Sequence, residues 1–237
     1  MAGTPALEIK GLEAWYGESH VLHGVDMVVQ PGEVVTLLGR NGAGRTSTLR
    51  AIMGLTGARK GSIKVYGTET IDMATHRIAH LGLGYCPEER GIFSSLSCEE
   101  NLLLPPALKT GQAGMSVDEI YAMFPNLAER KNSQGTRLSG GEQQMLAVAR
   151  ILRTGAKLLL LDEPTEGLAP VIVQQIGRTI REIKDLGYTI VLVEQNAHFV
   201  EGLADIHYLI ENGTIVDRLE AAEFAAQIDR VDRLLGV

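Results

Sequence analysis

Hydrophobic and polar residues alternate at the start of the chain and then give way to continuous apolar runs. Residues 7–15 alternate in the way that is typical of a half-buried β-strand. A second strand is expected over 25–29. The run 34–38 is almost wholly apolar and rich in β-branched residues, as in a strand buried on both faces. Two further elements are expected, a helix over 46–53 and a strand over 62–66.

The pattern becomes helical over residues 92–155, and strand and helix patterns alternate again from Lys157 onward. Strands are expected over 157–162, 189–194 and 206–210, helices over 171–186 and 197–204, and a hairpin turn at Asn212-Gly213 leading into 214–216. This order predicts an α/β fold with a mostly parallel sheet, an antiparallel β lobe at the N-terminus and a helical insertion over 92–155. The chain has no internal repeat, so a single domain over residues 1–237 is expected.

Composition narrows the class of protein. Of the 237 residues 45% are hydrophobic and 22% are charged, which is typical of a globular chain. The net charge of −7 argues against a nucleic-acid binder, which is expected to carry a basic face. Cys86 and Cys98 have no metal-ligand spacing and are expected to be reduced thiols. Residues 1–10 lack a secretory pattern, and no apolar run reaches the ~20 residues of a membrane helix, so any membrane attachment is expected to come from a partner.

A glycine-rich segment lies between the expected strand 34–38 and the helix that follows it. The spacing Gly39-x-x-x-x-Gly44-Arg45-Thr46 in this context predicts the phosphate-binding loop of a P-loop NTPase. Glycines let successive N–H groups face one anion, and the hydroxyl of Thr46 is expected to bind Mg²⁺. A turn without a ligand is the alternative, but it does not account for the motifs downstream. The residues expected to bind ATP here are Gly39, Asn41, Gly42, Ala43, Gly44, Arg45, Thr46 and Ser47.

Arg45 departs from this motif, which has lysine at that position. Arginine keeps the charge but is longer, planar and forked, so the exchange is not conservative in a tight site. In one interpretation Arg45 grips the phosphates with both arms of its guanidinium and supports turnover. In the other it holds ATP with a misplaced γ-phosphate and slows hydrolysis. We favour the interpretation that Arg45 retains ATP binding, and for the rate of ATP hydrolysis the two interpretations remain alternatives.

Two further motifs carry candidate chemistry. Asp162 and Glu163 end an apolar run, which predicts a carboxylate near Mg²⁺ and, beside it, a base that orients the attacking water. Ser139-Gly140-Gly141 precedes a helical pattern, with Ser139 as N-cap and small residues that permit close approach to a phosphate. One chain cannot easily bring this helix and the phosphate loop to the same γ-phosphate. The expected solution is a head-to-tail dimer with ATP between the two chains.

Together these residues resemble the nucleotide-binding subunit of an ABC transporter over almost the whole chain. Leu138 to Gln144 is similar to the signature of that family, and Tyr16 lies where the family stacks an aromatic ring on adenine. A core aromatic is the alternative for Tyr16. The segments around Glu88 and Gln195 resemble the LivF-type ATPases of branched-chain amino-acid importers. That resemblance implies that Glu88 reports on the γ-phosphate and Mg²⁺, and that Gln195 contacts the γ-phosphate or the water.

The resemblance also implies an assembly. Its expected partners are a second, related ABC ATPase or another copy of this chain, two transmembrane permease subunits and, indirectly, a periplasmic solute-binding protein. It places the chain at the cytoplasmic face of the inner membrane, as a peripheral subunit. An ATPase that energises uptake of branched-chain amino acids or a related solute is the first hypothesis, and a regulatory subunit with weak catalysis is the second. A soluble ABC protein of DNA repair or translation, and an exporter ATPase, fit the sequence less well.

One further expectation concerns docking. The stretch from Phe93 to Leu104 follows Glu88 and is expected to line the groove that meets the permease, with an ordinary packed helix as the alternative.

Overall fold

The computed structural model describes residues 3–108 and 113–236. The strands are β1 (Leu7–Tyr16), β2 (Ser19–Val29), β3 (Val34–Leu38), β4 (Arg59–Val65), β5 (Thr68–Glu69), β6 (Leu83–Cys86), β7 (Leu158–Asp162), β8 (Thr189–Glu194), β9 (Ile206–Glu211) and β10 (Thr214–Glu220). The helices are α1 (Arg45–Ile52), α2 (Thr75–Ala79), α3 (Cys98–Leu103), α4 (Val117–Met123), α5 (Pro125–Glu129), the 3₁₀ turn η1 (Gly135–Arg137), α6 (Gly140–Thr154), α7 (Pro170–Asp185), α8 (Ala197–Val200), α9 (Ala221–Ala226) and α10 (Ile228–Leu235).

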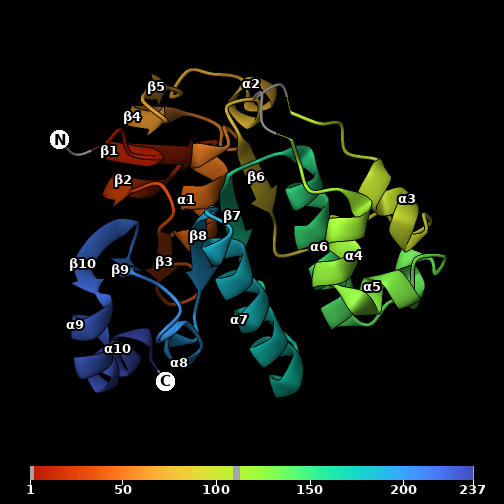
Figure 1. Cartoon of the computed structure of the whole chain (residues 1–237). Coiled ribbons are helices and arrows are strands. Elements are labelled where there is room, and N and C mark those ends of the chain that lie inside the picture. The colour runs from red at the N-terminus through yellow and green to blue at the C-terminus, as the bar shows by residue number, and fades with distance from the viewer. Residues whose placement is uncertain (1–2, 109–112, 237) are drawn as a thin grey trace.

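The strands form two sheets. One is antiparallel, in the order β2-β1-β4-β5, and the other has the order β10-β9-β3-β8-β7-β6. In the second sheet every pair is parallel except β9 with β10. This confirms the predicted α/β fold with an N-terminal antiparallel lobe. Figure 1 shows this lobe above the parallel sheet, with α3, α4, α5 and α6 grouped on one side.

The parallel sheet is buried on both faces, as its continuous apolar runs predict. Alternate residues of each strand point into different cores. Val34 and Leu38 of β3 pack with the helices α3 to α7, whereas Val35 and Leu37 pack with the antiparallel lobe and α1. The sheet therefore forms the middle layer, and its carboxyl ends carry the loops that are described below as a candidate site.

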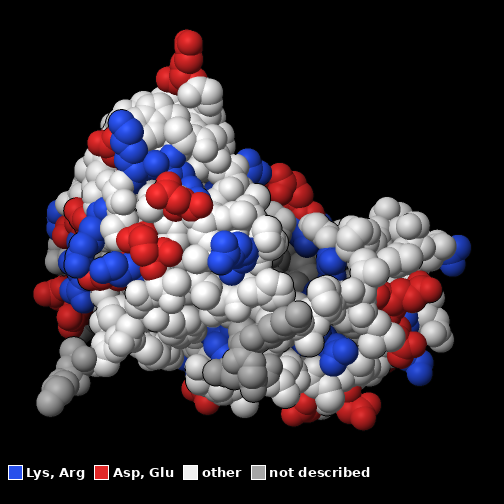
Figure 2. Space-filling view, turned by 90° about the horizontal axis from the view of Figure 1, so that it is seen from above, with Lys and Arg blue, Asp and Glu red and all other residues white. Residues whose placement is uncertain are grey.

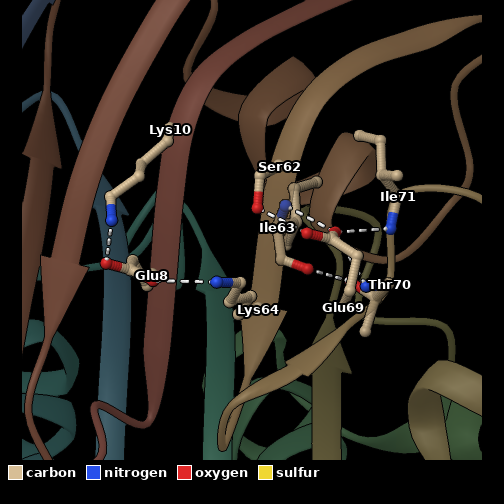
Figure 3. A network of polar contacts seen from close by, with 8 residues as sticks. All are labelled: Glu8, Lys10, Ser62, Ile63, Lys64, Glu69, Thr70 and Ile71. Atoms are coloured by element: carbon tan, nitrogen blue, oxygen red, sulfur yellow. Dashed lines mark hydrogen bonds and ion pairs between the residues drawn. The ribbon is translucent and has the colours of Figure 1, made fainter.

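A carboxylate network stabilises the edge of the antiparallel lobe (Figure 3). Glu69 accepts hydrogen bonds from the backbone N–H groups of Ile63, Thr70 and Ile71 and from the hydroxyl of Ser62. These bonds tie the short strand β5 to β4, and they lower the pKa of Glu69 against the opposing effect of burial. On the face seen from above, acidic and basic side chains are interspersed (Figure 2).

Several element boundaries differ from the sequence-based predictions. The strand expected over 25–29 is the second half of β2, which begins at Ser19, and the last strand extends to Glu220. The helix expected over 197–204 is wrong in length, because α8 ends at Val200 and Gly202 adopts a left-handed turn with φ of 67°. Elements not expected from the pattern are β5, β6, α2, α9 and α10.

The stretch 93–104 is only partly helical. Helix α3 begins at Cys98, where Ser97 forms a capping box with Glu100. Asn101 holds the preceding loop, since its side chain both accepts from the N–H of Phe93 and donates to the carbonyl of Phe93. A helix beginning at Phe93 is therefore excluded. Residues 109–112 of the expected helical insertion lie outside the described residues, so the division into subdomains stays a prediction.

Both cysteines are free and buried. Burial raises the pKa of the Cys86 thiol to about 12 and that of Cys98 to about 11. The side-chain amide of Gln144 lies 3.6 Å from the sulfur of Cys86. The expected free thiols are confirmed. No helix among the described residues has the length and hydrophobicity of a membrane span.

Candidate nucleotide-binding site

The phosphate loop connects β3 to α1, as predicted. Gly42 and Gly44 adopt left-handed backbone conformations, with φ of 81° and 111°. Gly39 is required for a different reason, because a Cβ atom there would lie 2.4 Å from the carbonyl oxygen of Ile210. The N–H groups of the first turn of α1 have no helical acceptor, and the helix dipole adds partial positive charge there. The loop can therefore receive an anion.

A cleft of about 690 Å³ opens over this loop. It contains the predicted residues Tyr16, Glu88 and Glu163 together with the loop residues Asn41, Gly42, Gly44, Arg45, Thr46 and Ser47. Tyr16 is 36% exposed, which leaves its ring free to stack on a ligand. The structure thus brings together predicted residues from four distant parts of the chain. A volume of this order suits a nucleotide-sized ligand.

Arg45 is buried in the cleft and is only 4% exposed. Its Nη2 atom lies 2.6 Å from Oε1 of Glu163 and 2.8 Å from Oδ1 of Asn41. Its Nη1 atom is buried without a hydrogen-bond partner. One arm of the guanidinium therefore pairs with the predicted base, while the other arm lacks an acceptor of the kind that a phosphate oxygen supplies.

Two of the three predicted metal ligands, Thr46 and Asp162, lie side by side, and the third, Glu88, lines the same cleft as Thr46. Thr46 donates its hydroxyl proton to Oδ1 of Asp162 at 3.0 Å, and Tyr85 donates to Oδ2 at 3.1 Å. Burial raises the pKa of Asp162, against the opposing effect of these two bonds. No group of three or more His, Cys, Asp or Glu side chains in the described part of the chain could hold a metal ion. A hydroxyl and one carboxylate fit Mg²⁺, which commonly completes its shell with waters and substrate phosphates.

Glu163 has an unusual backbone, with a positive φ of 45°. Burial is the main cause that raises the pKa of its carboxyl group. Glu166 raises it further, whereas Arg45 lowers it.

A second buried carboxylate, that of Glu194, holds the loop after Glu163. It accepts hydrogen bonds from both the N–H and the hydroxyl of Thr165, at 3.2 and 2.7 Å. Its pKa is raised to about 7 by burial. The two bonds to Glu194 fix the loop that carries Glu163.

Several predicted residues do not line the cleft. They are Gly39, Ala43, Ser139, Gly140, Gly141, Asp162 and Gln195, although Asp162 is hydrogen-bonded to the lining residue Thr46. Ser139 caps α6 in a capping box with Glu142, as predicted. Gly141 has a role within the chain, because a Cβ atom there would lie 2.5 Å from Cγ2 of Ile172 at the start of α7. Ser139 is exposed. In this chain the exposed N-terminus of α6 and the phosphate loop do not share one ligand cleft.

Comparison with known proteins decides the family. Residues 22–166 match the ABC transporter family. The chain belongs to that family. This ABC ATPase is 41% identical to the high-affinity branched-chain amino acid transport ATP-binding protein BraG of Pseudomonas aeruginosa, over 89% of this chain and 91% of that protein.

Other relatives of this ABC ATPase differ in what they transport. A probable LivF protein of Archaeoglobus fulgidus is 35% identical, over 86% of this chain and 87% of that protein. The lipopolysaccharide export protein LptB of Escherichia coli is 31% identical, over 89% and 88%. Among solved structures, a nucleotide-free ATP-binding cassette has a TM-score of 0.84 and 20% identity and covers 98% of this chain and 99% of its own. ATP binding and hydrolysis are the activities of this family.

Several residues of the ABC ATPase cleft were not predicted from the sequence. The cleft is also lined by His20, Val21, His23, Glu166, Asn212 and Gly213. Asn212-Gly213 was read only as a turn, yet the N–H of Gly213 donates to the carbonyl of Ala43 in the phosphate loop at 2.8 Å. A Cβ atom at Gly213 would lie 2.4 Å from the carbonyl oxygen of Val21. The glycine at position 213 was the available signal.

Proposed function

We propose that this ABC ATPase is the ATP-binding subunit of an importer that takes up branched-chain amino acids or a related small polar solute. The observation that carries the proposal is the greater identity to the branched-chain relatives BraG and LivF than to the exporter protein LptB. Glu88 and Gln195 support the same assignment, because they match the LivF-type pattern. ATP binding and hydrolysis by this subunit drive the transport cycle.

Each residue of the cleft has a proposed role. Backbone N–H groups of the loop from Gly39 to Ser47 hold the phosphates, and Tyr16 stacks on the adenine. Thr46, Asp162 and Glu88 would hold Mg²⁺, which when bound would neutralise charge on the phosphates. Glu163 orients the attacking water and accepts its proton. Gln195 approaches the γ-phosphate or the water from the end of β8.

The assembly is proposed to contain two ATPases. Ser139 at the cap of α6 is exposed, and Ser139, Gly140 and Gly141 do not line the cleft of their own chain, which supports delivery of this cap to the ATP of a partner. The partner is a second, related ABC ATPase, and a copy of this chain is the alternative. Two transmembrane permease subunits anchor the pair at the cytoplasmic face of the inner membrane, and a periplasmic solute-binding protein delivers the solute.

A second candidate function is favoured by one observation. The ion pair between Arg45 and Glu163 occupies an oxygen of the proposed base. If the guanidinium keeps this position when ATP is bound, the chain holds ATP and shapes the dimer while a partner performs hydrolysis. The short contact of 2.6 Å between Nη2 of Arg45 and Oε1 of Glu163 supports a persistent pair, whereas burial opposes it by raising the pKa of Glu163.

Uptake in the organism that encodes the chain tests the transport proposal. Deleting the gene is expected to abolish high-affinity uptake of labelled leucine, isoleucine and valine, and the wild-type gene is expected to restore it. A Glu163→Gln gene that restores uptake fully supports the second candidate instead. Unchanged uptake of all three amino acids, with loss of lipid or lipopolysaccharide export, contradicts the importer assignment.

A further inference from the structure

The C-terminal helix α10 makes polar contacts with two segments, the phosphate loop and the short helix α8. It buries Val231 and Leu235 in the core and leaves polar residues on its other face. In Figure 1 it lies beside α8 and α9, below the loops at the carboxyl ends of β3 and β8. Neither of its polar contacts reaches into the nucleotide cleft. Any effect of these contacts on the nucleotide must therefore be transmitted through the segments that they hold in place.

The first contact joins α10 to the phosphate loop. Arg40, the residue after Gly39, donates from Nε to the carbonyl oxygen of Leu234 at 2.9 Å and from Nη2 to that of Arg233 at 3.3 Å. These carbonyls lie in the last turn, where a helix has no internal donors and where a cation is favoured by the dipole. The guanidinium also covers Gly236, where a Cβ atom would lie 3.1 Å from its central carbon.

The second contact joins α10 to the segment that follows Gln195. Nε2 of His198 lies 3.2 Å from Oδ2 of Asp232. His198 belongs to the short helix α8, whose N-cap Asn196 accepts from the N–H of Phe199 at 3.0 Å. Gln195 is directly before this cap. A displacement of α8 would therefore displace Gln195.

We propose that α10 is a strut that couples the phosphate loop to the Gln195 segment, with Arg40, His198 and Asp232 as positioning residues. An anion that draws the loop inward moves Arg40 and, through the last turn of α10, Asp232. Asp232 then carries His198 and α8 with it. The inference goes beyond the transport function, because it concerns communication within one chain whatever solute or partner the chain has.

The competing interpretation is that α10 only completes the hydrophobic core. In that case Arg40 and His198 would affect their own surroundings and nothing further. The two interpretations differ in one measurable property, namely whether a ligand on the phosphate loop alters the Gln195 segment through α10. Mg-ADP is the suitable probe, because it lacks the γ-phosphate and so has no direct contact with Gln195.

Hydrogen exchange on the purified full-length chain measures this transmission. In the wild type, Mg-ADP is expected to slow exchange in residues 39–46 and also, by about threefold to tenfold, in residues 195–200. In His198→Ala the slowing over 39–46 is expected to remain and that over 195–200 to disappear. His198 is a suitable position, because its side chain is 66% exposed and its removal leaves the core intact.

Arg40→Ala tests the other end of the strut. It is expected to abolish the slowing over 195–200 as His198→Ala does, and Arg40→Lys is expected to restore part of it, because lysine can still donate to a last-turn carbonyl. Arg233→Ala is the matched control, since it removes a charge from the same turn but leaves both contacts in place. Slowing over 195–200 that persists in His198→Ala and Arg40→Ala, or that is absent in the wild type, overturns the proposal.

Discussion

Arg45 is the residue at which this chain departs most from the phosphate-loop pattern. Its guanidinium occupies the cleft and joins Asn41 to Glu163, so that the anion-binding loop and the proposed base share one cation. An ammonium group is compact and lacks the planar fork that makes this bridging geometry rigid. The spacing of the motif gives no indication of this pair, which forms only because the ends of β3 and β7 approach in the folded sheet.

Arg45→Lys is expected to raise phosphate release from Mg-ATP by about tenfold, because it frees Glu163 to orient water at the correct distance. The measurement is steady-state phosphate release by the purified chain, with Glu163→Gln as the baseline without a base. A lower rate in Arg45→Lys than in the wild type would mean that arginine is the adapted residue at this position. If wild type, Arg45→Lys and Glu163→Gln are equally slow, the assay is repeated with the partner ATPase.

His207 determines a pH dependence of stability. It is buried in β9 with its ring stacked on Phe224 and Nδ1 bonded to Thr36, and burial lowers its pKa to about 4. Between pH 6.5 and 4 the unfolded chain binds a proton that the folded chain does not, so stability falls as pH falls through this window. The loss attributable to His207 is about 2 kcal/mol by pH 5.

Urea unfolding at pH 7.5 and pH 5 measures this loss. A His207→Gln variant is expected to show a smaller difference between the two pH values than the wild type, although it is less stable at both. His80→Gln serves as a matched control that removes an exposed histidine instead of the buried one. Equal pH differences in wild type and His207→Gln would contradict the assignment.

At the scale of elements, α6 combines a structural cap with a proposed recognition surface. Ser139 and Glu142 form a reciprocal capping box, in which the N–H of Ser139 donates to Oε2 of Glu142 at 2.7 Å and the N–H of Glu142 donates to Oγ of Ser139 at 3.3 Å. Either residue can be removed at a similar cost in helix stability. In the proposed assembly, however, only Ser139 would offer a hydroxyl at the helix N-terminus to a partner's ATP.

Ser139→Ala and Glu142→Ala are therefore a matched pair. Each is expected to lower the free energy of unfolding by about 1 kcal/mol. Only Ser139→Ala is expected to reduce ATP hydrolysis in the assembled ATPase pair, by about tenfold or more, because a donor to the γ-phosphate is lost. Thermal unfolding and phosphate release separate the two effects. A similar loss of hydrolysis in both variants would indicate that the cap matters only for folding.

At the scale of the whole molecule, the proposed assembly makes each ATP site composite, with the phosphate loop from one ATPase and the α6 cap from the other. Glu163→Gln is expected to bind Mg-ATP without hydrolysing it and so to accumulate as a dimer with the second ATPase when the two are mixed. Light scattering after size-exclusion chromatography should give the summed mass of the two subunits. Ser139→Ala combined with Glu163→Gln should form less of this dimer, because the bridging cap is lost. A dimer of Glu163→Gln in the absence of the second ATPase would indicate that the partner is a copy of this chain.

Periodicity predicted most of the fold. The buried runs at 34–38 and 189–194 correspond to β3 and β8, because a strand covered on both faces must be apolar throughout. Strand β6 was missed, since four residues that include Gly84 carry too short a pattern to detect. Gly84 is nevertheless required, because a Cβ atom there would lie 1.9 Å from Ile151 of α6. Such a requirement depends on a neighbour that is distant in the sequence.

Much of the candidate site was also predictable from the sequence. Most of the phosphate loop, Tyr16, Glu88 and Glu163 line one cleft, and each follows or ends a strand. The walls supplied by His20, His23 and the Asn212-Gly213 turn were not predictable, since they belong to no phosphate-binding motif. The pairing of Arg45 with Glu163 depends on side-chain geometry that no spacing encodes.

The burial of both native thiols has a practical consequence. Cys86 and Cys98 lie in the core with thiol pKa values raised to about 12 and 11, so at neutral pH neither carries the thiolate that alkylating reagents attack. A cysteine introduced at the exposed position of Ser139, or on the outer face of α10, would be the reactive one. Fluorophores or spin labels could thus be attached at single chosen positions without first replacing a native residue, and distances between two subunits could be followed through the ATP cycle.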